Sequence, residues 1–149
     1  MSGSTESQLS ALKLEAISYK KLSDYAKAEK CILKGLELKP DSNSFTHELA
    51  KIHFKTKKYQ LCLQLLLSLS NKVKRRQILF KDIAMCYYKM NKLTESLEAV
   101  QVSLSENPES ISSLYVEGLI HKELGNFSES ISSFTKLLGL DSDNRDALY

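Results

Sequence analysis

The sequence predicts an all-α protein, a solenoid of tandem helix–turn–helix repeats. The first observation is composition, because the chain contains only five Gly and two Pro, too few for a fold of many short strands and tight turns. The second is a set of residue types that recurs with a period of about 34 residues, as a repeat fold requires wherever its packing geometry is the same. The third is the placement of Pro40 and Pro108, which are separated by two such periods.

Four consecutive repeats of equal length fit this spacing without insertion or deletion. Their predicted bounds are 9–42, 43–76, 77–110 and 111–144. We expect residues 1–8 to form a flexible N-terminal segment and residues 145–149 to begin a truncated fifth repeat. With no polar helix to cover it, the last helix should expose an apolar strip of Ile131, Phe134 and Leu138. Such a strip would favour self-association through the C-terminal repeat or a continuation of the array.

Small and bulky residues occupy different positions of the repeat. The eighth and twentieth positions are small, and the eleventh, seventeenth and twenty-fourth are mostly bulky. Small residues let two helices approach closely, and bulky ones fill the space beside them. The small positions hold Ala16, Ala50, Ala84 and Gly118, and Ala28, Cys62, Ser96 and Ser130; the bulky ones hold Tyr19, His53, Tyr87 and His121, Tyr25, Tyr59, Leu93 and Phe127, and Ile32, Leu66, Val100 and Phe134.

Each repeat is predicted to form two helices joined by a short turn, at about positions 2–15 and 18–31. Asp24, Asn91 and the pair Gly125–Asn126 lie at the expected turns and suit turns or helix caps. Pro40 should end the second helix of the first repeat. One helix pair is too small to bury its own apolar stripe, so stability must come from stacking on neighbouring repeats.

These positions, with Pro at position 32 of the first and third repeats, resemble the tetratricopeptide repeat signature over residues 9–144. The fourth position, where the signature usually has Trp, holds Leu12, Thr46, Phe80 and Leu114. The second and fourth repeats also lack the final Pro. The resemblance implies a right-handed α-solenoid whose first helices line a concave groove. It further implies a protein–protein interaction scaffold or adaptor within a larger complex, and not an enzyme.

The resemblance also implies that positions 2, 5, 6, 9, 12 and 13 of each repeat face the groove. Eight lysines and three carboxylates occupy these positions, a net charge of +5 against +3 for the whole chain. Such a surface suits an acidic, amphipathic peptide, although lysines on helices often only solvate an exposed face. Leu14, Ile78 and Val116 are among the apolar residues expected there. The residues expected to bind the partner are Lys13, Ile17, Lys20, Lys51, Phe54, Lys55, Lys81, Met85, Tyr88, Lys89, Tyr115, Leu119 and Lys122.

A dense basic run lies at the junction of the second and third repeats and contains Lys72, Lys74, Arg75 and Arg76. Such a run can act as a nuclear-import signal or contact nucleic acid, and it is also typical of a solvated loop. Lysines near aromatic groove residues resemble surfaces that hold single strands, so an RNA-binding repeat module is the alternative function. The chain has only three Arg and a modest net charge, which disfavours that alternative.

One specific partner, the C-terminal EEVD tail of heat-shock chaperones, is not expected. In the family that this chain resembles, a clamp of Lys, Arg and Asn at five groove positions holds the carboxylates of that tail. Only Lys13 matches, and Glu48 and Asp82 place negative charge where the clamp would hold a carboxylate. The two alignments give Lys13, Ile17, Glu48, Ile78 and Asp82, or His47, Lys51, Asp82, Ser112 and Val116.

No constellation of residues points to catalysis, a cofactor or a metal ion. His53 and His121 belong to the bulky eleventh position, and no second ligand stands at metal-ligand spacing from His47. We find no phosphate-binding loop and no pair of carboxylates in an expected cleft. The sequence therefore predicts a binding protein.

The cysteines and the apolar runs indicate an intracellular protein. Cys31, Cys62 and Cys86 are odd in number and lack the spacing of a zinc motif, which favours the reducing cytoplasm or nucleus. No apolar run is long enough to cross a membrane. The start MSGSTESQ is not expected to be a secretory signal.

Overall fold

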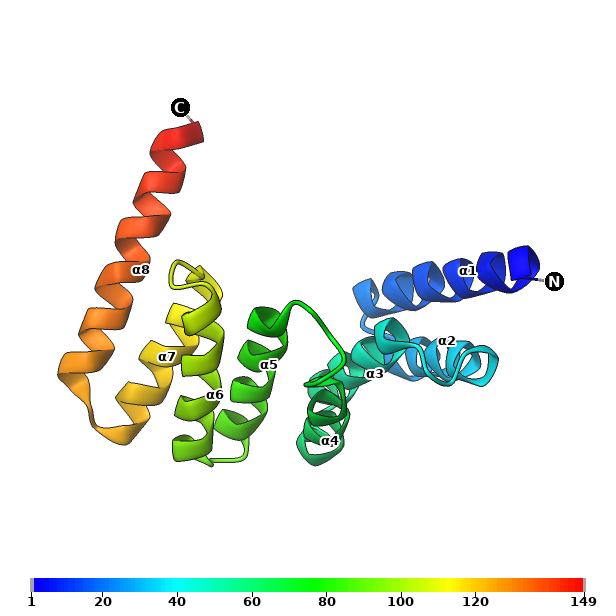
Figure 1. Cartoon of the computed structure of the whole chain (residues 1–149), viewed down its shortest axis with the longest axis horizontal. Coiled ribbons are helices and arrows are strands. Elements are labelled where there is room, and N and C mark those ends of the chain that lie inside the picture. Colours follow the sequence, from blue (N-terminus) through cyan, green and yellow to red (C-terminus); the bar gives the residue numbers. More distant parts are fainter. Residues whose placement is uncertain (1, 149) are drawn as a thin grey trace. The chain divides into compact units, whose positions relative to one another are not determined.

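The computed structural model describes residues 2–148, and side chains for residues 4–142. Within that range it contains eight α-helices and no strand (Figure 1), so the predicted all-α fold class is confirmed. The helices are α1 (Ser2–Lys21), α2 (Tyr25–Leu38), α3 (Asn43–Lys55), α4 (Tyr59–Leu69), α5 (Arg76–Lys89), α6 (Leu93–Glu106), α7 (Ile111–Leu124) and α8 (Phe127–Leu148).

The chain forms two compact units, Met1–Lys72 and Val73–Tyr149, here called unit 1 and unit 2. Unit 1 contains α1 to α4, and unit 2 contains α5 to α8. In each unit, consecutive helices pack against each other as antiparallel pairs (Figure 1). The second helix of the first pair also packs against the first helix of the next, so the helices of one unit form a continuous stack.

Every helix pair turns through a residue in the left-handed conformation. These residues are Ser23 (φ 59°), Lys57 (φ 64°), Asn91 (φ 60°) and Gly125 (φ 80°), which all hold the fifteenth position of the predicted repeat. The amide of the next residue then donates a hydrogen bond to the carbonyl of the eleventh position, at 2.8 to 2.9 Å in all four turns. This bond closes the C-terminus of the first helix in the same way each time.

Side chains cap only some of the helices. Asp24, Ser42 and Ser110 accept hydrogen bonds from the amides of the third residue beyond them, at 3.2 to 3.3 Å, and so satisfy free donors of the first turn. At the N-termini of α4, α5 and α6, the capping residues make no such side-chain bond.

The small positions of the repeat meet inside each helix pair. Ala16 and Ala28 are buried in unit 1, as are Ala50 and Cys62. In unit 2, Ser96 and Ser130 are also buried, and their hydroxyls donate hydrogen bonds to the carbonyls of the eighth-position residues. The prediction that small residues stand where two helices cross is therefore confirmed.

A glycine under an aromatic ring sets the next contact in each unit. A methyl group on Gly35 of α2 would overlap the ring of Phe45 of α3, and one on Gly118 of α7 would lie 2.6 Å from the ring of Phe134 of α8. Neither ring could keep its place above a larger residue. These two glycines therefore allow α2 and α3, and α7 and α8, to approach closely.

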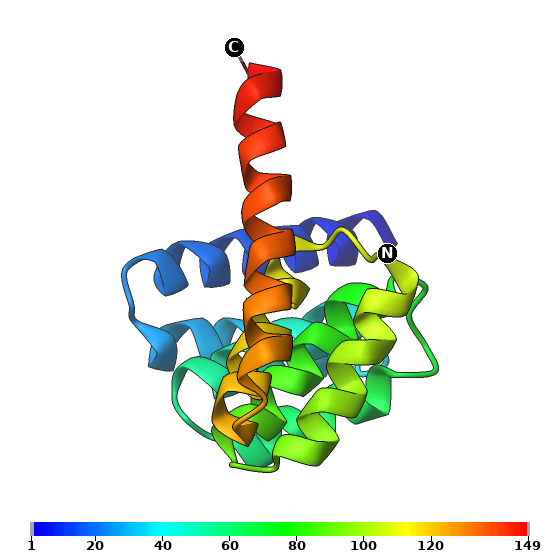
Figure 2. The same ribbon diagram turned by 90° about the vertical axis from the view of Figure 1, so that its left-hand side faces the viewer.

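Two expectations about the chain ends are wrong. Residues 2–8, expected to be a flexible segment, belong to helix α1, since no Pro interrupts them and adding residues to an existing helix costs little. The last helix was expected to end near residue 141, but α8 continues unbroken to Leu148, beyond the end of α7 (Figure 2). The fourth repeat lacks the Pro that follows α2 and α6, so nothing in the sequence stops the helix. The exact repeat bounds stay a prediction.

Candidate partner-binding face

In unit 1, the groove positions of α1 and α3 form one connected polar surface. The ammonium Nζ of Lys13 donates a hydrogen bond to the hydroxyl Oγ of Ser44 at 2.7 Å. Lys20 Nζ lies 2.5 Å from Glu48 Oε2, and Lys51 Nζ lies 3.4 Å from Glu48 Oε1. Two lysines from different helices therefore converge on a single carboxylate.

Glu48 is the best ordered charge of this surface, because its side chain is only 12% exposed. Burial by itself would raise its pKa, but the hydrogen bond from Lys20 and the charges of Lys51 and Lys20 outweigh burial and hold the pKa below its ordinary value. Glu48 is therefore ionised at neutral pH and fixes both lysines beside it.

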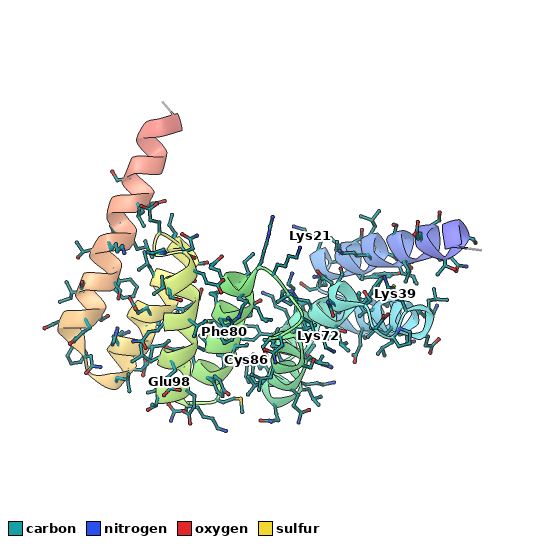
Figure 3. The ribbon with its side chains drawn as sticks, in the orientation of Figure 1. Lys21, Lys39, Lys72, Phe80, Cys86 and Glu98 are labelled. Atoms are coloured by element: carbon teal, nitrogen blue, oxygen red, sulfur yellow. The ribbon has the colours of Figure 1, made fainter. Side chains whose placement is uncertain are left out.

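Apolar side chains lie among the lysines of unit 1. Ile17 and Phe54 are half-buried, and Leu14 is 65% exposed. The ring of Phe54 packs edge-on against Tyr59 of α4, with 5.4 Å between ring centroids, which holds it at the end of α3. Lys21, at the C-terminal end of α1 (Figure 3), and Lys55 are exposed.

The groove positions of unit 2, on α5 and α7, carry less charge and more aromatic surface. Lys81 Nζ lies 2.8 Å from Asp82 Oδ1. Tyr88 of α5 donates a hydrogen bond to the carboxylate of Glu123 of α7, and burial together with this carboxylate raises the pKa of the Tyr88 hydroxyl. Tyr115 is 52% exposed, and its ring lies edge-on to Phe134, 6.0 Å away between centroids.

The positive charge of the groove positions is divided unequally between the units. Unit 1 has five lysines against Glu48, a net charge of +4, whereas unit 2 has three lysines against Asp82 and Glu123, a net charge of +1. Sequence reasoning treated the groove as evenly basic. The structure instead separates a basic face on unit 1 from a nearly neutral, aromatic face on unit 2.

No residue expected to bind the partner is buried. Lys13, Ile17, Lys20, Phe54, Lys81, Met85, Tyr88 and Leu119 are half-buried, and Lys51, Lys55, Lys89, Tyr115 and Lys122 are exposed or half-exposed. Val116, which was also expected at the groove surface, is only 3% exposed. That expectation is wrong, because Val116 is a core residue of unit 2.

The basic run is exposed along its length. Lys72 ends unit 1, its carbonyl oxygen 3.5 Å from the side-chain amide of Asn43, and Lys74 and Arg75 are exposed. The guanidinium of Arg76 lies over the ring of Phe80, 4.9 Å from its centroid; Lys72 and Phe80 are labelled in Figure 3. This stacking orders Arg76 as the first residue of α5.

The histidines have structural surroundings. His53 is buried, its Nδ1 has no hydrogen-bond partner among the described residues, and burial lowers its pKa. His121 lies 3.4 Å from the side-chain amide of Asn126 in the following turn. Among the described residues, no group of three or more His, Cys, Asp or Glu could hold a metal ion, and no helix has the length and apolarity to cross a membrane.

Two surface features of unit 2 lie outside the groove. A shallow cavity of about 300 Å³ opens between α6, α7 and α8 and is lined by Leu104, Pro108, Leu114, Glu117, Ser132, Ser133 and Lys136; no sequence pattern indicated it. The apolar strip expected on α8 is present, but one member differs. Ile131 and Leu138 are 66% and 64% exposed, whereas Phe134 is half-buried against Gly118 and Tyr115.

Comparison with known proteins decides the family. The tetratricopeptide repeat family model matches residues 14–42 and 111–144, which are parts of the first and fourth predicted repeats. The chain is a tetratricopeptide repeat protein. Repeats of this family are scaffold modules rather than enzymes, so the chain is a protein–protein interaction scaffold. No curated protein matches it, and no specific member of the family is identified.

Solved structures show the same fold. The chain is similar to MamA residues 41-end from Desulfovibrio magneticus RS-1, with 21% identity, a TM-score of 0.82, and 91% of this chain and 76% of that one covered. A second MamA crystal structure has 18% identity and a TM-score of 0.79, covering 95% and 81%. A tetratricopeptide repeat protein from Parabacteroides merdae ATCC 43184 has 20% identity and a TM-score of 0.77, covering 91% of this chain and 54% of its own. These similarities confirm the helical-repeat solenoid; its right-handed sense stays a prediction.

Proposed function

We propose that this protein holds an acidic, amphipathic segment of a partner protein on its first-helix faces, as one component of a larger complex. The observation that carries the proposal is the basic face of unit 1, with its net charge of +4 and the apolar side chains of Leu14, Ile17 and Phe54 among the lysines. A charged surface with apolar anchors selects a segment that offers both kinds of contact.

The contacts of Glu48 support the choice of an acidic ligand. Lys20 and Lys51 already hold one carboxylate at 2.5 and 3.4 Å, so the spacing of α1 and α3 suits carboxylate binding. Lys21 and Lys55 are exposed at the ends of the same two helices. They would bind further carboxylates of the partner.

Unit 2 would supply the apolar contacts. Met85 and Tyr88 of α5 and Leu119 of α7 are half-buried, and Tyr115 is exposed. Aromatic side chains of this kind contribute large contact areas at a low cost in conformational entropy. The apolar residues of the partner segment would pack against them.

The same carboxylates disfavour the alternative, an RNA-binding module. Glu48 lies between two of the lysines that phosphates would need, and Glu123 accepts a hydrogen bond from the aromatic side chain best placed for stacking, Tyr88. Both would repel phosphate. We place the protein in the cytoplasm or nucleus, and the burial of Cys31, Cys62 and Cys86 in helical cores supports their role as small core residues in a reducing compartment.

Quantitative affinity capture from cell extract tests the proposal with two variants of equal charge. Lys51→Glu with Lys81→Glu changes the groove faces, and Lys30→Glu with Lys136→Glu changes exposed sites on α2 and α8 by the same amount. We expect partners lost from the groove variant and retained by the control, with both variants equally helical by circular dichroism. Equal capture by both would refute the proposal. If capture falls steeply with salt and is sensitive to ribonuclease, RNA is the ligand instead.

A further inference from the structure

The outer face of α8 exposes apolar residues at positions that are covered in earlier helices. Phe127, Ile131 and Leu138 are 64%, 66% and 64% exposed. At the same repeat positions, Leu93, Leu97 and Leu104 of α6 are half-buried. The residues are equally apolar in both helices, so the difference lies in what covers them.

Within each unit, a helix of one type covers these positions. Leu36, the α2 counterpart of Leu138, packs against a core cluster that includes Phe45, Leu49 and Ile52 of α3. These three residues hold the third, seventh and tenth positions of the repeat and lie on one face of α3. The chain therefore shows what fits such a surface: an amphipathic helix with large apolar residues at i, i+4 and i+7.

The row of residues beside the exposed strip also suits a helix. Ser128, Ser132, Thr135 and Gly139 follow one another at intervals of four, three and four residues, and all four are exposed and uncharged. The corresponding row of α2 includes Lys30 and Glu37, and that of α6 includes Glu98 (Figure 3). Small, uncharged side chains let a second helix approach closely and cost little to desolvate.

A second copy of this chain would not supply the required helix. The first helix of the array, α1, has Ala11, Glu15 and Ser18 at the third, seventh and tenth positions, and all three are exposed. A glutamate cannot replace the buried Leu49 at the centre of such a contact without a large desolvation cost. One end of the array is therefore polar and closed, and the other is apolar and open.

We propose that an amphipathic helix of a partner protein docks on the outer face of α8, with its apolar residues at i, i+4 and i+7 against Phe127, Ile131 and Leu138. This site is separate from the lysine face of unit 1 and does not depend on the proposed function. Ser128, Ser132 and Thr135 would flank the docked helix. The protein would then hold two partner segments, or two parts of one, at different places.

The chain's own α3 provides the probe. A fluorescent peptide of residues 42–56, held helical by a lactam bridge on its polar face, carries Phe45, Leu49 and Ile52 in the required spacing. Fluorescence anisotropy measures its binding to the full chain. We expect saturable binding that Ile131→Asp weakens by about tenfold or more, the cost of facing a charge with apolar residues. Leu22→Asp, at another exposed leucine (76%), and the Lys51→Glu with Lys81→Glu variant should bind the peptide normally.

Three outcomes would overturn the proposal. They are no saturable binding to the wild-type chain, equal binding to the Ile131→Asp variant, and equal binding of a control peptide in which Phe45 and Leu49 are replaced by Ser. Sedimentation of the chain alone distinguishes the other occupant. A dimer that Ile131→Asp abolishes and that excludes the peptide would show that a second copy covers α8.

Discussion

The hydroxyl of Ser96 donates a hydrogen bond to the carbonyl oxygen of Ala84 at 2.7 Å, and one repeat later Ser130 makes the same bond to Gly118 at 2.9 Å. In both cases the twentieth position of the repeat contacts the eighth. Equivalent residues of different repeats thus have equivalent partners. This equivalence is the physical basis of the repeat, because each pair of helices crosses at its smallest side chains.

The glycine at the eighth position of the fourth repeat predicts a pair of opposite effects. Gly118→Ala would place a methyl group 2.6 Å from the Phe134 ring, and we expect it to destabilise the protein by about 1–3 kcal/mol despite the better helix propensity of Ala. Gly139→Ala meets open space in the same helix pair and should stabilise by about 0.5–1 kcal/mol. Urea denaturation measures both. Similar effects of the two changes would contradict the close packing at Gly118.

The left-handed turns predict an improvement at Lys57. Its φ of 64° costs about 1–2 kcal/mol for a residue with a side chain, so Lys57→Gly should stabilise by roughly 0.5–1 kcal/mol after the entropy of the unfolded glycine is subtracted. Gly125→Ala, at the same repeat position with φ 80°, should destabilise by about 1 kcal/mol. Thermal unfolding tests both; a loss of stability in Lys57→Gly would argue against the left-handed conformation there.

Glu48 predicts a loss of stability in acid. Its folded-state pKa lies below the ordinary value because of Lys20 and Lys51, so its contribution is fully present above the unfolded pKa of about 4.3 and disappears as pH falls through the folded pKa. Glu48→Gln should flatten the slope of unfolding free energy in that range and leave it unchanged at higher pH. An unaltered slope below pH ~4.3 would show that the carboxylate is not held by the lysines.

His53 predicts a second, separate pH effect. Burial lowers its folded pKa, so the unfolded chain binds more protons and stability falls as pH drops below about 6.5. The eleventh position is Tyr in the first and third repeats, and His53→Tyr should remove this dependence between neutral pH and the range where Glu48 titrates. Chemical denaturation at a series of pH values separates the two effects. If the dependence survives in His53→Tyr, other groups cause it.

The helices and their crossings could be predicted from the sequence because both are set by local pattern and by residue size. Ala84 and Ser96, for example, hold positions that are small in every repeat, and the turn at Asn91 is marked by a residue that tolerates positive φ. The ends of the chain could not be predicted in this way. Helix α8 runs to Leu148 because no residue stops it, and a missing stop signal is harder to detect than a present one.

The binding face was predicted only in outline. The positions of Lys20 and Lys51 follow from the repeat, but their shared contact with Glu48 depends on how α1 and α3 lie together. Val116 was assigned to the groove by its position in the repeat, yet it is buried, since the sixth position of α7 turns inward where its neighbours pack. Position in a repeat defines a helix face within about one residue, and burial decides the rest.

Nuclear magnetic resonance tests the central claim, that aromatic rings lie on glycines at fixed places in the stack. The α protons of Gly35 and Gly118 should show upfield ring-current shifts and nuclear Overhauser contacts to the rings of Phe45 and Phe134. Gly139, which meets open space, should show neither. Ordinary shifts and no ring contacts at Gly35 and Gly118 would contradict the packing on which the repeat, the lysine face and the open face of α8 all depend.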